Sequence, residues 1–170
     1  MRLRRSALFF AAFLVSGQCP AQQDALVPSS AIVEKLTGTV TNTPEKFSRY
    51  RNLVPVAAPS IDLTINFRVG AATLGPGGKA QLLELSKALS NDLLRDKKVV
   101  VEGHTDVQGS PELNLRLSSQ RATAVVVFLV DSGIDRDRLS SVGKGYSDLL
   151  DKQNPTSAKN RRVTVRVEAP

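Results

Sequence analysis

Few of the residue types that build metal centres or catalytic sites occur in this sequence. Its 170 residues include one cysteine, one histidine and no tryptophan. Metal sites need several cysteine, histidine or carboxylate ligands, and no such group clusters around the single histidine, His104. No Gly-x-Ser-x-Gly motif accompanies it to support a serine hydrolase. We therefore expect no catalytic residue, metal or cofactor, and interpret His104 as hydrogen-bonded at a strand end.

The first 21 residues have the pattern of a secretory signal peptide. Three arginines at positions 2, 4 and 5 precede an unbroken run of nine apolar residues at 7–15. That run is shorter than the roughly 20 residues that a membrane span needs. Cys-Pro-Ala at 19–21 fits the small-x-small pattern of a signal peptidase site, so we expect cleavage after Ala21. The alternative is a lipidated N-terminus at Cys19, and neither version leaves a transmembrane span in the mature chain.

Removal of this leader would change both the charge and the thiol chemistry of the protein. The remaining residues include 20 basic and 16 acidic side chains, a net charge of +4 instead of +7. This small excess, without a basic stripe and with 5% aromatic residues, argues against a nucleic-acid partner. Cleavage after Ala21 would also remove the only cysteine, which excludes disulfides and thiolate metal ligands.

Residues 22–59 are interpreted as a tether or linker that precedes a folded domain at 60–170. Pro28 lies near the beginning of this segment, and Pro55 and Pro59 close it in a stretch expected to be extended. A small apolar group at Ile32, Val33 and Leu36 is compatible either with one short helical turn or with docking on the domain.

From residue 60 onward the apolar pattern predicts the order β-α-β-α-β-β. Alternation over residues 61–67 and 162–168 predicts two half-buried strands, and the valines at 99–101 predict a central one. Helices are expected at about 79–94, after a loop at 70–78, and at 111–131 between an N-cap at Ser110 and a stop at Gly133. A further strand is expected at 139–142. This order predicts an α/β two-layer sandwich with both helices on one face of a mixed four-stranded sheet.

The loop and helix after the central strand hold the most informative polar residues. Asp106 follows that strand, and Arg121 shares a helix face with Asn114 and Ser118. A fixed carboxylate and a fixed guanidinium suit a zwitterionic ligand, because Arg121 can hold a carboxylate with two parallel hydrogen bonds. The alternative is an internal salt bridge or two solvated charges. The apolar residues of this helix are interpreted as core: Leu113, Leu117 and Val125.

These segments together resemble the OmpA-like peptidoglycan-binding domain, which also occurs in peptidoglycan-associated lipoproteins and in MotB-type motor stators. The resemblance covers residues 60–168. The matching motifs are Gly103-His104-Thr105-Asp106, Gly109, Asn114-x-x-Leu117-Ser118-x-x-Arg121-Ala122-x-x-Val125 and Asn160-Arg161-Arg162-Val163. One departure is the loop after Phe67, where many relatives carry an aspartate and this chain has Arg68.

The resemblance implies a non-enzymatic module in the periplasm of a Gram-negative cell, associated with the cell wall and near the outer membrane. Its partner would be peptidoglycan, bound through the diaminopimelate of the peptide stem. In the family, the residues that match Asp106 and Arg121 bind diaminopimelate. Asn114 matches a further ligand contact, and Arg161 or Arg162 matches another basic contact. Thr105 and Ser118 belong to the same motifs. The alternative is an interaction protein of the envelope that keeps the fold but binds a protein partner.

Overall fold

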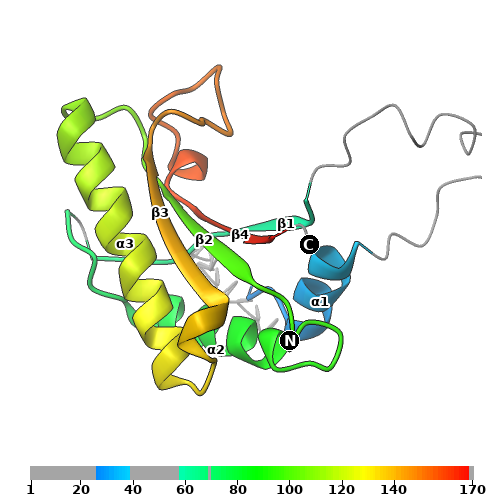
Figure 1. The fold of residues 1–170 in the computed structure, drawn as a ribbon. Coiled ribbons are helices and arrows are strands. Elements are labelled where there is room, and N and C mark those ends of the chain that lie inside the picture. The colour runs from blue at the N-terminus through cyan, green and yellow to red at the C-terminus, as the bar shows by residue number, and fades with distance from the viewer. Residues whose placement is uncertain (1–25, 39–57, 69, 169–170) are drawn as a thin grey trace, which may run out of the picture.

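A four-stranded sheet forms the centre of the computed structural model, which describes residues 26–38, 58–68 and 70–168 (Figure 1). The strands are β1 (Ser60–Leu63), β2 (Val99–His104), β3 (Leu139–Gly145) and β4 (Val163–Val167). Their order across the sheet is β1-β4-β2-β3, with β4 antiparallel to both neighbours and β2 parallel to β3. The predicted mixed sheet is confirmed, and β2 lies inside it as predicted.

Two long helices cover one face of the sheet, as predicted. They are α2 (Pro76–Leu89) and α3 (Pro111–Asp131), which connects β2 to β3 (Figure 1). The buried core contains alternate strand residues, such as Val99, Val101 and Val165, together with leucines and valines of both helices. Two short 3-10 helices, Arg136–Arg138 and Ala158–Asn160, precede β3 and β4. Within the described ranges, no helix has the length and apolar character to cross a membrane.

A third helix, α1 (Ser29–Thr37), corrects the expectation that the folded part begins at residue 60. Ile32 and Leu36 lie one helical turn apart, so both point to the same side, and both are almost completely buried in the core. The backbone of Val27 exchanges two hydrogen bonds of 2.8 and 2.9 Å with the side-chain amide of Gln81 on α2. Residues 26–38 therefore belong to the folded unit, whereas the expected signal peptide and residues 39–57 of the tether lie outside the described residues.

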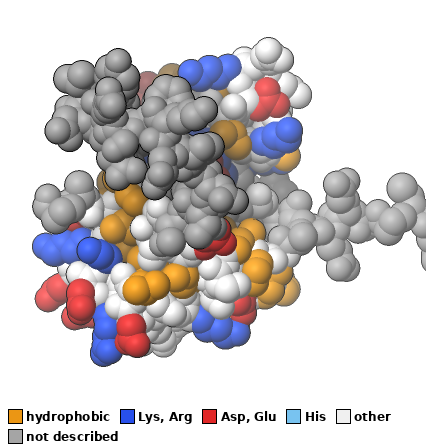
Figure 2. Space-filling model, turned by 90° about the vertical axis from the view of Figure 1, so that its right-hand side faces the viewer, with side chains coloured by type: hydrophobic (Ala, Val, Ile, Leu, Met, Phe, Trp, Pro, Cys, Tyr) orange, Lys and Arg blue, Asp and Glu red, His pale blue; other side chains and the backbone are white. Residues whose placement is uncertain are grey.

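The side of the molecule on which α1 lies carries charges of both signs. Figure 2 shows lysine, arginine and acidic side chains around apolar side chains in the lower part of the described surface. A hydrogen bond of 3.0 Å joins the backbone N–H of Ser29 to the Glu84 carboxylate of α2. The burial of Ile32 and the contacts of Val27 and Ser29 fix α1 beside α2.

Several element boundaries differ from the sequence prediction. Helix α2 begins at Pro76 instead of residue 79, since proline suits the first position of a helix, and it ends at Leu89 instead of 94. Strand β1 ends at Leu63, and Phe67 pairs separately with Leu74. Helix α3 agrees with the prediction, because the Ser110 hydroxyl accepts a hydrogen bond from the Leu113 N–H at 3.2 Å.

Helix α3 approaches β2 and β3 so closely that only glycine fits at two strand positions. A Cβ atom on Gly103 would collide with the carbonyl oxygen of Ser118. A Cβ atom on Gly143 would lie 2.8 Å from the carbonyl oxygen of Leu115 and would collide with Ser119. This close packing fixes the beginning of α3 next to the C-terminal end of β2.

Candidate functional site

A pocket of about 650 Å³ lies at the C-terminal end of β2. Its walls come from the β1–α2 loop, the β2–α3 loop, the first turns of α3 and the segment before β4. Of the seven residues expected at the site, six line this pocket: Thr105, Asp106, Asn114, Arg121, Arg161 and Arg162. The fold therefore brings together side chains that are up to 57 positions apart in the sequence.

Asp106 is buried and held through both of its oxygens. Oδ1 accepts a hydrogen bond from the Gln108 N–H at 3.1 Å, and Oδ2 forms an ion pair of 2.9 Å with Nη1 of Arg161. Among the described residues, the ion pair of Asp106 is thus made with Arg161 and not with Arg121. An internal Asp106–Arg121 salt bridge, the alternative considered from the sequence, is not observed in this part of the chain. Each carboxylate oxygen retains capacity for another donor.

Arg121 is held without a carboxylate partner among the described residues. Its Nε donates to the carbonyl oxygen of Ala71 at 3.1 Å, and its guanidinium carbon lies 5.1 Å from the centre of the Phe67 ring. Its exposed fraction is 9%, and burial lowers the pKa of Arg121, assisted by the positive charge of Arg161 and opposed by Asp106. Its two terminal nitrogens have no hydrogen-bond partner within the described ranges, so they are available to a ligand.

Asn114 and Thr105 shape the loop between β2 and α3. The Asn114 side chain is buried, and its Nδ2 donates to the carbonyl oxygen of Gln108 at 2.9 Å. The Thr105 N–H donates to the carbonyl oxygen of Gly145 at 2.8 Å. The buried Thr105 hydroxyl has no hydrogen-bond partner in the described part of the chain. Asn114 therefore holds this loop to the first turn of α3, and Thr105 holds it to β3.

Ser118 is the one expected site residue that the structure does not bring to the pocket. It is completely buried, its hydroxyl donates to the carbonyl oxygen of Leu115 at 2.8 Å, and it accepts from the Gly145 N–H at 2.9 Å. Ser118 thus connects α3 to β3 outside the pocket, and its expected contact with a ligand stays a prediction.

The consecutive residues Asn160, Arg161 and Arg162 have three different roles. Asn160 is completely buried, and its side-chain amide forms four hydrogen bonds to the backbone of residues 151–155. Arg161 reaches Asp106, whereas Arg162 forms ion pairs with Asp62 at 3.1 Å and Asp148 at 3.4 Å. Because these carboxylates balance the charge of Arg162, Arg161 is the better candidate for the second basic residue of the site.

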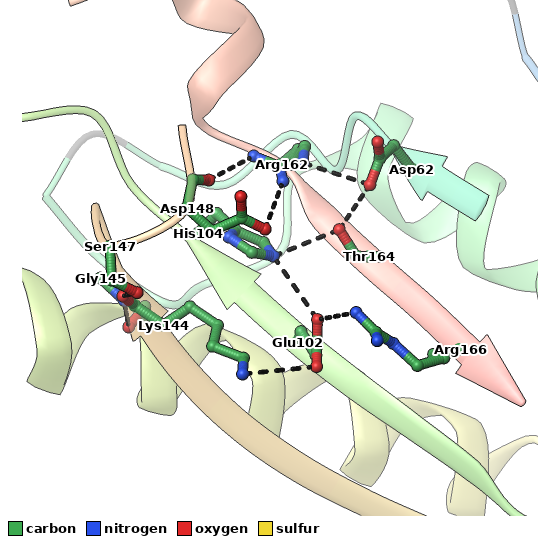
Figure 3. A network of polar contacts seen from close by, with 11 residues as sticks. Asp62, Glu102, His104, Lys144, Gly145, Ser147, Asp148, Arg162, Thr164 and Arg166 are labelled. Atoms are coloured by element: carbon green, nitrogen blue, oxygen red, sulfur yellow. Dashed lines mark hydrogen bonds and ion pairs between the residues drawn. The ribbon is translucent and has the colours of Figure 1, made fainter. Parts of the chain in front are cut away.

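A network of polar side chains extends from Arg162 across the sheet face opposite the helices (Figure 3). Nε2 of His104 lies 3.2 Å from the Thr164 hydroxyl, in agreement with a hydrogen-bonded histidine at a strand end. Burial is the main cause that lowers the pKa of His104, followed by the nearby charge of Arg162. Glu102 lies 3.1 Å from Arg166 and 3.6 Å from Lys144. The sheet face opposite the helices therefore carries paired side chains at its centre.

Several pocket residues were missed or misjudged from the sequence. Leu113 has an exposed fraction of 48% and lines the pocket, and Leu117 lines it while partly buried, so their assignment to the core was wrong. Val125 is in the core as expected. Phe67 was recognised only as a strand residue, and Ala71 acts through its carbonyl oxygen, which no side-chain pattern reveals.

The OmpA family matches residues 66–162. Outer membrane protein A of Shigella flexneri is 35% identical over 127 residues, which cover 69% of this chain and 36% of that protein. This chain therefore spans about a third of the length of that curated relative.

Solved structures agree with this match. A putative MotB-like protein from Desulfovibrio vulgaris has a TM-score of 0.55 at 26% identity, covering 65% of this chain and 73% of that one. The peptidoglycan-associated lipoprotein of Burkholderia pseudomallei has the same fold, with a TM-score of 0.52 at 23% identity and coverage of 63% and 89%. The chain belongs to the OmpA family, whose domains generally bind peptidoglycan and are not enzymes.

Proposed function

We propose that this protein binds peptidoglycan non-covalently through the diaminopimelate of the peptide stem, and so anchors an envelope component to the cell wall. The observation that carries this proposal is the environment of the Arg121 guanidinium. Its guanidinium is buried and oriented, yet its terminal nitrogens lack a partner among the described residues. A buried cation without a counter-ion has lost hydration, and a ligand carboxylate would offset that loss.

The proposed ligand has an ammonium and a carboxylate on one side-chain carbon, and the pocket offers one group for each. Arg121 would bind the carboxylate through its two terminal nitrogens, and Asp106 would accept from the ammonium. Arg161 holds Asp106 in place and brings a second positive charge to the pocket. Thr105 would contribute from the β2–α3 loop, and Asn114 from the first turn of α3.

The proposed location follows from the same ligand, because peptidoglycan lies in the periplasm of a Gram-negative cell. A relative named outer membrane protein A supports a place in the envelope. The affinity for an isolated stem peptide should be modest and should fall with added salt, since the ligand is small and its main contacts are charged.

Co-sedimentation with purified sacculi tests the proposal. Wild type should pellet with sacculi that contain diaminopimelate, and less with sacculi that carry lysine, which has the ammonium but lacks the second carboxylate. Arg121→Gln should weaken binding by about 10-fold or more, because loss of even one charged hydrogen bond costs roughly 1.5–3 kcal/mol. Arg116→Gln is the matched control, since Arg116 is an exposed arginine of the same helix.

The outcomes separate the proposed function from its alternative. Binding of wild type and Arg116→Gln, with loss in Arg121→Gln and Asp106→Asn, supports the site. Equal binding by all four proteins would place the wall-binding site elsewhere. Wild type that remains in the supernatant would refute wall binding and favour the interpretation as an envelope protein with a protein partner.

A further inference from the structure

The contacts of Arg121 come from a segment to which the sequence assigned no role in binding. Phe67 and Ala71 belong to the loop between β1 and α2, whereas Arg121 lies on α3. The Phe67 ring faces the guanidinium at 5.1 Å, and the Ala71 carbonyl oxygen accepts from Nε at 3.1 Å. These are the only two polar or ring contacts that fix the guanidinium within the described ranges.

We infer that Phe67 and Ala71 are positioning residues that hold the Arg121 guanidinium with its terminal nitrogens directed into the pocket. A guanidinium is a planar group, and its orientation needs one contact on its face and one on its edge. The Phe67 ring supplies the face contact, and the Ala71 carbonyl supplies the edge contact at Nε. The two nitrogens that remain form the pair that matches a carboxylate.

The loop is shaped to make these contacts through its own backbone. Phe67 pairs with Leu74, and the Arg68 N–H donates to the carbonyl oxygen of Thr73 at 3.0 Å. The Ala71 N–H donates to the carbonyl oxygen of Arg68 at 3.1 Å, which leaves the Ala71 carbonyl for Arg121. The loop therefore acts through its shape and through one aromatic ring, and not through a charged side chain.

An aromatic ring suits this role better than an anion. Its negative face attracts a desolvated cation. A carboxylate at the same place would pair with the guanidinium and compete with the ligand carboxylate for it. Phe67 thus stabilises the charge of Arg121 without occupying the terminal nitrogens. This inference rests on the proposed function for its binding consequences, but the orientation of Arg121 does not depend on the ligand.

The first test is binding of a soluble stem peptide that ends in diaminopimelate, measured by calorimetry beside its lysine analogue. Phe67→Leu should weaken binding of the diaminopimelate peptide by about two- to thirtyfold, the range expected for loss of a cation–π contact. Phe67→Leu should weaken binding of the lysine peptide less, because that peptide lacks the carboxylate that the two terminal nitrogens of Arg121 would bind. Phe67→Tyr keeps the ring and should restore both affinities. A loss that is equal for the two peptides, or a failure of Phe67→Tyr to restore binding, would show a purely structural role and overturn the inference.

The second test does not need peptidoglycan. In the wild type, the Nε–H resonance of Arg121 should be shifted by the Phe67 ring and should exchange slowly with water, because Nε is hydrogen-bonded to Ala71. Arg121→Gln identifies the signal by its disappearance. Phe67→Leu should move the signal and speed its exchange, with the free energy of unfolding measured in parallel. An unchanged signal in a folded Phe67→Leu variant would overturn the positioning role. If the wild type failed to bind sacculi, only the proposed function would be overturned.

Discussion

Truncation of Ile32 should destabilise the protein strongly, although the residue lies outside the part of the chain that matches the OmpA family. Ile32 is 0% exposed and is part of the same buried core as the residues of α2 and the sheet. Ile32→Ala removes three carbon atoms from that core, which corresponds to roughly 2–2.5 kcal/mol of lost transfer free energy. The cavity left behind raises the expected cost to about 2–5 kcal/mol.

The assay is urea unfolding at pH 7.5, with Glu34→Ala as the matched control. Glu34 is an exposed residue of the same helix, and its truncation should change the free energy of unfolding by less than about 0.5 kcal/mol. Hydrogen exchange distinguishes global destabilisation from local undocking of α1, because undocking would expose the amides of α1 alone. If Ile32→Ala differed from wild type by no more than Glu34→Ala does, α1 would not belong to the cooperative core.

Three further predictions concern the support of the pocket. The stability of the wild type should fall as the pH drops through about 6.5, by at most about 1.4 kcal/mol per unit, because His104, the only histidine, binds a proton more readily when unfolded. His104→Gln should abolish this slope between pH 5.5 and 7.5 in urea titrations, and an unchanged slope would contradict the assignment. Gly143→Ala should lower the free energy of unfolding in urea by about 1–3 kcal/mol or more, since the added carbon collides with α3. Gly133→Ala is the control for backbone strain alone, because Gly133 has a positive φ and open space around it. Asn160→Ala should cost about 1–3 kcal/mol and weaken sacculus binding, because four hydrogen bonds of the loop before Arg161 are lost; normal binding and stability would refute that role.

The parts of the fold that were predictable from the sequence are those with local signals. Helix α3 has a serine cap, a proline at its first position and a glycine just after it, and its bounds were predicted correctly. The valine run identified the inner strand β2. The docking of α1 was one of two alternatives that the sequence left open, because three apolar residues in a long linker do not reveal whether a core surface is available to them. Burial of Ile32 depends on α2 and β1, which are remote in sequence.

The candidate site likewise has a part that local sequence predicts and a part that depends on residues remote in sequence. Asp106, Asn114 and Arg121 belong to one continuous strand–loop–helix segment, and their approach to one pocket follows from that local geometry. The partners of the charged groups come from elsewhere. Arg161 reaches Asp106 across 55 positions, and Ala71 reaches Arg121 across 50. Which arginine faces the pocket and which faces the sheet therefore depends on strand register and loop shape, and the side-chain pattern alone left Arg161 and Arg162 equivalent.

These remote partners explain why the two charges singled out from the sequence do not simply neutralise each other. Arg161 forms the ion pair with Asp106, and the β1–α2 loop holds Arg121 through a ring and a carbonyl. Arg161 makes the one ion pair of Asp106 among the described residues, so without it the Asp106 carboxylate would have no charged partner there. The separation of the two charges is thus stabilised by a third charge and by a neutral aromatic face. A pocket built in this way keeps one cation with free donors beside one anion with spare acceptor capacity, which is the arrangement that a zwitterionic ligand requires.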